Sequence, residues 1–437
     1  MRLEPLNIFE LDTPVAPTVS RLREMLAVTY RAQFGNYLQV FAGTGLRLGL
    51  QAVYFFFLAN TLSLRDMGSF ASASATGIMI GCFSGFGFSS FAFRAAAGRR
   101  SSLGGYLAVF YVSWLISLPL CVAASLPVFF LLFTTSLSLT AFVVIILVEA
   151  GTWRIVEMIH QVNNGLGRYA SASLVISLGT ALRTASAVVL MASGRHDIET
   201  WSIFYVTFNF TAMAMVIALF QPAVRMRWRT RLFLGRIHDA LMFSISYCAS
   251  ISQNEIDKLV MLSLADQRAV GIYAISSRII DFTSVPIRTF YVLYSRKLIL
   301  DGRLRKLIGR SLGIEAMIAL ISTLGFAVLL LVLSIWPNLL GHNVGSAAQL
   351  FGVLLAVPAF KNLLEYHSEL FFACQRMTIR AVLATSLVGL KAGALAVLLL
   401  CFNGIAEWGV WLNVVYVGLY LLSAVVLYQV IFKADSQ

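Results

Sequence analysis

The chain has 437 residues, of which 59% are hydrophobic and only 12% are charged, whereas soluble domains carry roughly 25% charged residues. A water-soluble fold cannot hide so much apolar surface, so lipid must solvate part of the protein. The net charge of +13 does not indicate nucleic-acid binding, because no soluble domain is left to carry a basic face. The five cysteines show neither metal-ligand nor disulfide spacing, and P-loop, zinc-protease and nucleophile-elbow motifs are absent. We therefore expect no metal, no cofactor and no enzyme.

About twelve apolar runs are long enough to cross roughly 30 Å of hydrocarbon. The first six cover 36–60, 67–92, 106–130, 138–163, 169–193 and 200–221. The second six cover 240–264, 269–294, 312–335, 346–373, 379–401 and 408–432. We predict an all-α polytopic membrane protein with two six-helix lobes, at 36–221 and 240–432. A basic linker, 222–239, would join the lobes, and segments 1–35 and 433–437 would lie outside them.

Basic residues concentrate on one side of these spans, in 1–35, 94–100, 225–236 and 296–310. The other side carries only Arg65, Arg195 and Arg268. Because Lys and Arg are enriched in cytoplasmic loops, both termini are predicted to be cytoplasmic, in a bacterial inner membrane. The basic runs would then contact anionic lipid headgroups. The predicted external connections are short, which leaves no room for an external catalytic domain.

The two halves resemble each other at constant offsets. The segment 65–71 (RDMGSFA) parallels 268–274 (RAVGIYA) at an offset of 203 residues. An offset of 208 pairs Glu157 with Glu365 and Arg183 with Lys391. Each half has an even number of spans, so the repeats would be parallel and related by an axis along the membrane normal. Transporters of this kind hold their substrate between the two halves.

Charged side chains inside the spans are candidate functional residues, because burying a charge at the bilayer centre costs a few kcal/mol or more. Three mid-span cations, Arg47, Arg183 and Lys391, have no acid nearby on their own helix. An anionic ligand would suit them, and arginine binds phosphate in a bidentate manner. The alternative is that they pair across helices with Glu149, Glu365 or Asp257.

Other charged residues have the spacing of local ion pairs. These are Arg154 with Glu157, Arg278 with Asp281, and Lys361 with Glu365. For them, mutual neutralisation is as reasonable as contact with a ligand. A dense cluster of Asn254, Glu255, Asp257 and Lys258 suits a gate or a proton or sodium site. His160 and His367 each lie near a carboxylate in the sequence, which allows a coupling role, although interfacial histidines are the commoner outcome.

Several motifs resemble polysaccharide flippases of the multidrug/oligosaccharidyl-lipid/polysaccharide exporter superfamily. In the first half these are 58–62 (LANTL), 65–71 and the glycine-rich stretch to Gly87 and Arg94. The second half has 256–258 (IDK) followed by 271–274 (GIYA), and 167–169 (GRY) is similar to a further family turn. The resemblance spans both lobes. It implies a V-shaped pair of lobes around a cationic cavity, and transport of a polyprenyl-pyrophosphate-linked glycan.

That resemblance implies roles for the candidate residues. Substrate would meet Arg47, Arg183, Lys391, Arg154 and Lys258, while Trp153 could stack on sugars. Coupling or gating would involve Glu157, Glu365, Asp257 and Glu255. The expected partners are membrane lipids, a lipid-linked glycan, and glycosyltransferase or polysaccharide synthase or polymerase machinery.

Two other functions are consistent with the sequence. One is an ion-coupled multidrug antiporter of the same superfamily, although the core of the first span carries Arg47 and no carboxylate. The other is a membrane-embedded glycan polymerase or acyltransferase, which the short external loops disfavour.

Overall fold

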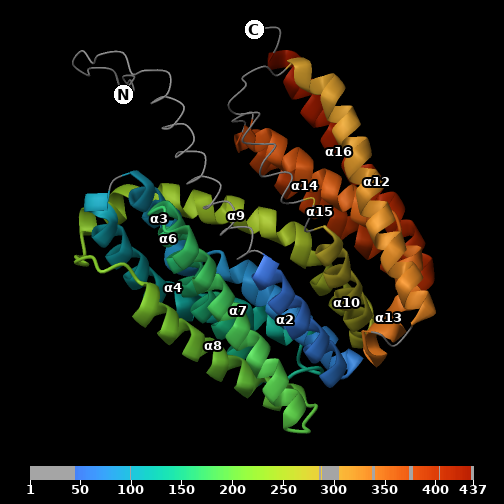
Figure 1. Ribbon diagram of the computed structural model, residues 1–437, viewed down its shortest axis with the longest axis horizontal. Coiled ribbons are helices and arrows are strands. Elements are labelled where there is room, and N and C mark those ends of the chain that lie inside the picture. Colours follow the sequence, from blue (N-terminus) through green and yellow to red (C-terminus); the bar gives the residue numbers. More distant parts are fainter. Residues whose placement is uncertain are drawn as a thin grey trace, which may run out of the picture.

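The computed structural model describes residues 45–98, 100–284, 287, 305–336, 340–373, 377–402 and 404–434. The predicted segment 1–35 and most of the basic run 296–310 lie outside these residues. All regular elements in the described part are helices, and the two lobes are visible as separate groups of them (Figure 1). Among the described residues, seven helices are long and apolar enough to cross a membrane, and nine if two bent pairs each form one span. This confirms the all-α polytopic fold.

The N-terminal lobe begins with a helix over 45–61. Its elements are α2 (Leu64–Gly81), η1 (Ser84–Gly87), α3 (Phe88–Gly98), α4 (Arg100–Leu132), α5 (Leu139–Ile146), η2 (Leu147–Thr152), α6 (Trp153–Gly165), α7 (Tyr169–Ala192) and α8 (Ile198–Phe220). Grouping α2 with α3, and α5 with η2 and α6, gives six helical segments that correspond to the six predicted spans.

The C-terminal lobe also contains six helical segments in the described residues when α13 and α14 are counted as one bent span. Its elements are α9 (Thr230–Leu264), α10 (Gln267–Thr283), α12 (Arg305–Ile335), α13 (His342–Val353), α14 (Val357–Ala373), α15 (Met377–Cys401) and α16 (Ile405–Ala434). The helix α9 starts well before the predicted lobe boundary at residue 240. Its first half packs on the N-terminal lobe, where the Tyr247 hydroxyl donates to Glu157 Oε1 at 2.9 Å. Much of the predicted linker is therefore helical and part of this packing.

A sharp bend divides the second span at residues 85–87. Gly85, Phe86 and Gly87 all have positive φ angles, of 70°, 48° and 79°, and α2 and the η1–α3 segment meet at 50°. A Cβ atom on Gly87 would lie 2.1 Å from the carbonyl oxygen of Ala240. Glycine therefore both permits the left-handed turn and lets α9 approach the bend.

The lobes touch most closely where α2 crosses α10. A Cβ on Gly68 would lie 2.0 Å from the Gln267 carbonyl oxygen, and a Cβ on Gly271 would lie 2.0 Å from that of Leu64. Both glycines and both carbonyls are related by the offset of 203 residues. The helix caps obey the same offset, because Ser63 caps α2 and Asp266 caps α10. The sequence repeat is thus realised as a two-fold contact between the lobes.

Polar contacts join the lobes at the same end, which we call the outer end because it lies on the side predicted to be external. The Asn343 amide donates to the carbonyl oxygens of Ala59 at 2.7 Å and Leu62 at 2.8 Å. The Asn60 amide donates to the Leu340 carbonyl oxygen at 2.8 Å. At the opposite end α3 and the start of α9 diverge from the C-terminal lobe (Figure 1). A cavity of about 820 Å³ lies there between α3, α9 and α15. The described residues are therefore closed at the outer end and open at the other.

Candidate functional site

A buried glutamate sits on the π-helical segment η2 at the centre of the N-terminal lobe. Glu149 is 2% exposed, and π-helical turns of this kind are frequent at functional sites. A Cβ on Gly77 would lie 2.8 Å from Glu149 Cβ, so the small face of α2 lets η2 approach. The Glu149 carboxylate accepts hydrogen bonds from Ser74 Oγ at 2.7 Å and from the Tyr205 hydroxyl at 2.6 Å.

Arg183 of α7 faces this carboxylate. Its guanidinium lies 3.5 Å from Glu149 Oε2 and donates from Nε to Asn209 Oδ1 at 3.2 Å. The guanidinium carbon also lies 4.2 Å from the ring centre of Trp153 and 5.1 Å from that of Tyr205. The cross-helix alternative therefore holds for Arg183: a carboxylate neutralises its charge, and aromatic rings hold its plane.

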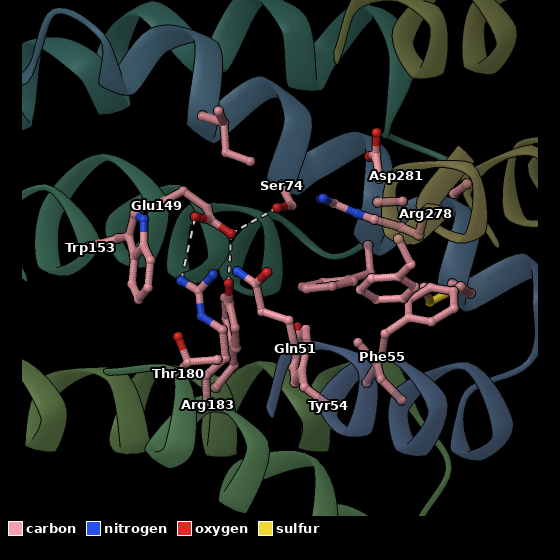
Figure 2. A pocket seen from close by; sticks show the side chains of 18 of the residues that line it. Gln51, Tyr54, Phe55, Ser74, Glu149, Trp153, Thr180, Arg183, Arg278 and Asp281 are labelled. Carbon is pink, nitrogen blue, oxygen red and sulfur yellow. Dashed lines mark hydrogen bonds and ion pairs between the residues drawn. The ribbon is translucent and has the colours of Figure 1, made fainter. Parts of the chain in front are cut away.

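The opposite wall comes from the C-terminal lobe. Figure 2 shows Arg278 reaching from α10 toward Ser74, with Asp281 drawn above it. The predicted local pair of Arg278 and Asp281 is wrong, because Asp281 Oδ1 accepts from Lys361 Nζ of α14 at 2.7 Å. Arg278 is exposed to the space between the lobes and has no ion-pair partner among the described residues. Lys258 of α9 also lines this wall and pairs with Glu255.

The helix over 45–61 closes the space from a third direction. Its residues Arg47, Gln51 and Tyr54 face inward from successive turns. Within the described part of the chain Arg47 has no ion-pair partner, and its buried Nε has no hydrogen-bond partner. The predicted unpaired cation at Arg47 is therefore present, and it is joined by Arg278, which the sequence had suggested as a local partner of Asp281.

These three walls enclose a central cavity of about 280 Å³ that both lobes line (Figure 2). Four basic residues line it, namely Arg47, Arg183, Lys258 and Arg278. Its two acidic lining residues are Glu149 and Asp281. Both carboxylates and Lys258 have partners, whereas Arg47 and Arg278 have no ion-pair partner in the described part of the chain, so these two guanidiniums set the electrostatic character of the cavity. They lie on different lobes, which suits the binding of an anion between them.

The remaining predicted site residues do not line this cavity. Lys391 Nζ lies 2.7 Å from Asp257 Oδ2 inside the C-terminal lobe, the cross-helix pairing left open above. Arg154 and Glu157 form the predicted local pair at 2.8 Å and line a separate cavity of about 30 Å³. Glu365 of α14 is also absent from the central lining, and Lys361 makes its ion pair with Asp281 instead of Glu365.

Two lining aromatics, Tyr54 and Tyr205, carried no sequence signal beyond being aromatic residues in apolar spans. Arg278 did carry a signal, namely a charge within a span. Its spacing to Asp281 suggested local neutralisation, and the sequence could not show that Lys361, 80 residues away, takes that acid.

This two-lobed helical architecture around a central cavity is similar to the fold of solved transporters of the MOP superfamily. No protein-family model and no curated protein matches the sequence. Among solved structures, an inward-facing multidrug resistance MATE family transporter is similar, with a TM-score of 0.69 and 14% identity over 90% of this chain and 95% of its own.

Two further solved structures share the fold. A MOP superfamily transporter from Pyrococcus furiosus, whose binding pocket is described as having reversed polarity, has a TM-score of 0.64 and 13% identity over 91% of this chain and 95% of its own. The lipid II flippase MurJ, in an inward closed conformation, has a TM-score of 0.59 and 11% identity over 89% of this chain and 87% of its own. At these identities the comparisons establish the fold and leave the cargo to be argued from the site.

Proposed function

We propose that this protein is a membrane transporter that moves a polyprenyl-pyrophosphate-linked oligosaccharide, or exports a related polysaccharide, across the bacterial inner membrane. The observation that carries the proposal is the pair of guanidiniums of Arg47 and Arg278, which face one cavity from opposite lobes and have no ion-pair partner among the described residues. A diphosphate offers oxygens to both at once, and guanidinium–phosphate pairs are commonly bidentate. The aromatic rings of Tyr54 and Trp153 beside them provide surfaces on which a sugar could stack.

The arrangement of the lobes supports alternating access. The cavity lies between parallel repeats that touch at the outer end and separate at the other, predicted cytoplasmic, end. Cargo would enter from the cytoplasmic side, and closure there with opening of the outer end would release it across the membrane. Glycosyltransferases or a polysaccharide synthase would supply the cargo.

Binding of a short polyprenyl pyrophosphate to the full-length protein in nanodiscs tests the proposal. Farnesyl pyrophosphate is the probe, farnesol is the uncharged comparison, and calorimetry is the measurement. A hydrogen bond to a charged group contributes about 1.5–3 kcal/mol, so Arg278→Gln and Arg47→Gln should each weaken binding at least tenfold. Arg236→Gln is the matched control, because its exposed side chain pairs with Asp239 outside the cavity. Unchanged affinity in both cavity variants would contradict an anion site.

A multidrug antiporter is the second candidate, and the apolar aromatic part of the lining favours it. Phe55, Phe70 and Phe282 line the cavity together with the acidic Glu149 and Asp281. Both carboxylates are already paired with cations, which leaves a cationic drug no free acid to bind. Competition between farnesyl pyrophosphate and a lipophilic cationic dye separates the two functions. In cells, deletion should leave lipid-linked glycan on the cytoplasmic leaflet without increasing sensitivity to cationic drugs.

A further inference from the structure

A separate group of buried ionisable side chains lies inside the C-terminal lobe, away from the central cavity. Glu315 of α12 is 3% exposed and His367 of α14 is fully buried. The imidazole Nε2 lies 3.4 Å from Glu315 Oε1, and Nδ1 lies 2.9 Å from Ser423 Oγ of α16. Two tyrosines of α16 complete the group. The Tyr420 hydroxyl donates to Glu315 Oε2 at 2.6 Å, and the Tyr428 hydroxyl donates to Oε1.

Glu315 differs from the other buried carboxylates in the kind of countercharge it has. Glu149, Glu157, Glu255, Asp257 and Asp281 each pair with an arginine or a lysine. Arginine and lysine side chains have ordinary pKa values above 10. The partner of Glu315 is a histidine, whose ordinary charge change falls between about pH 5 and pH 8. Among the described ion pairs of the spans, this is the one whose charge balance depends on a histidine.

Among the described residues, proton binding is the remaining means of balancing this charge. Helix α12 contributes Glu315, α14 contributes His367 and Tyr366, and α16 contributes Tyr420 and Tyr428. Helices α10 and α13 also pack on α12, but among the described side chains they place no ionisable group within bonding distance of Glu315. Helix α15 packs on α14 and α16, and its Arg380 donates to Ser368 and pairs with Glu369. With one proton shared between them, Glu315 and His367 are neutral together. With none the pair carries a buried negative charge, and with two a buried positive charge, and each of these is costly in an apolar bundle.

Helix α14 connects this pair to the central cavity. His367 lies on the same helix as Lys361, which binds Asp281 in the cavity wall at 2.7 Å. A change of charge at Glu315 and His367 alters the hydrogen bonds that join α14 to α12 and α16. Any resulting movement of α14 reaches the cavity wall through Lys361.

We propose that Glu315 and His367 form a proton-binding site of the C-terminal lobe through which proton uptake and release are coupled to movement of the lobes. Proton binding itself does not depend on the proposed cargo. The coupling rests on the proposed transport function, because movement of the lobes is a step of that transport.

Infrared spectra of the full-length protein in nanodiscs test proton binding directly. We expect a change in the carboxylate bands that grows as the pH falls from about 8 to about 5, because a proton taken up by the imidazole changes its hydrogen bond to Glu315. It should be lost in Glu315→Gln and kept in Glu369→Gln, a matched control on α14 whose acid pairs with Arg380. His367→Gln should move the midpoint by about one pH unit or more. No titrating signal in the wild type, or the same signal in Glu315→Gln, would overturn the site.

A second variant keeps the test decisive if Glu315→Gln does not fold. Tyr420→Phe removes one donor to the carboxylate and nearly preserves shape, so it should also move the midpoint. Coupling is tested with spin labels at Arg65→Cys and Arg268→Cys, both exposed at the outer end, after replacement of the native cysteines. Their distance distribution should change with pH in the wild-type background but not with Glu315→Gln. A pH-independent distribution in the wild-type background would refute the coupling, whatever the cargo proves to be.

Discussion

Substitution of Gly68 by alanine should prevent the outer end from closing fully. The added Cβ would lie 2.0 Å from the Gln267 carbonyl oxygen, whereas real Cβ contacts are essentially never shorter than 3.0 Å. The helices α2 and α10 must therefore separate by at least about 1 Å, and backbone cannot yield as a side chain can. Overpacking of this kind costs about 1–3 kcal/mol, and such an energy changes a two-state ratio roughly 5- to 150-fold. The closed outer end should become a minor state.

The spin-label pair at Arg65→Cys and Arg268→Cys measures this directly. Gly68→Ala should shift the distance distribution to longer values, and Gly271→Ala should do the same because it occupies the equivalent position. Gly325→Ala is the control, since a Cβ there meets nothing within 4 Å. A folded Gly68→Ala protein with the wild-type distribution would refute the view that this crossing holds the outer end closed.

Three further outcomes follow from the contacts. Arg183→Gln leaves Glu149 without its cation, and breaking a buried ion pair costs about 3–5 kcal/mol. The Tm of the Arg183→Gln variant should therefore fall well below the Tm of Arg278→Gln. Equal Tm values for the two variants would contradict the assigned pairing. Asn343→Ala loses two hydrogen bonds across the outer end, roughly 1–3 kcal/mol, and should lengthen the spin-label distance as the glycine variants do. A backbone amide in the first turn of α8 holds the pKa of Asp197 below its usual value. The hydrogen bond to ionised Asp197 therefore stabilises the folded protein above the pKa that Asp197 has in the unfolded chain. This stability is lost as the pH falls through the lower pKa of Asp197 in the folded protein. Asp197→Ala should accordingly lower Tm at pH 7 but not in strong acid.

The helices were largely predictable because hydrophobic length and charge sidedness act along the chain. The helix α9 shows where that information ends. Its first turns are basic and polar, so hydropathy assigned them to a linker, while packing against the bend at Gly87 makes them helical and part of the N-terminal lobe. The repeat at an offset of 203 was also predictable, because residues at corresponding positions cap a helix or allow close helix packing in both halves.

The site was less predictable, since charge pairing depends on which helices meet. Arg183 and Lys391 lack a local acid, and the sequence could only name Glu149, Glu365 and Asp257 as alternatives. Contacts between helices selected Glu149 for Arg183 and Asp257 for Lys391. For the same reason Arg278 was assigned a partner on its own helix and instead faces the cavity.

The glycine crossing of α2 and α10 has a consequence for the origin of the chain. In this crossing, equivalent glycines of the two halves each contact the equivalent carbonyl of the other half. An isologous two-fold dimer makes the same kind of self-complementary contact. A six-helix ancestor carrying this single glycine would already have paired with a second copy of itself through it. Duplication and fusion would then have preserved a ready-made interface between the halves.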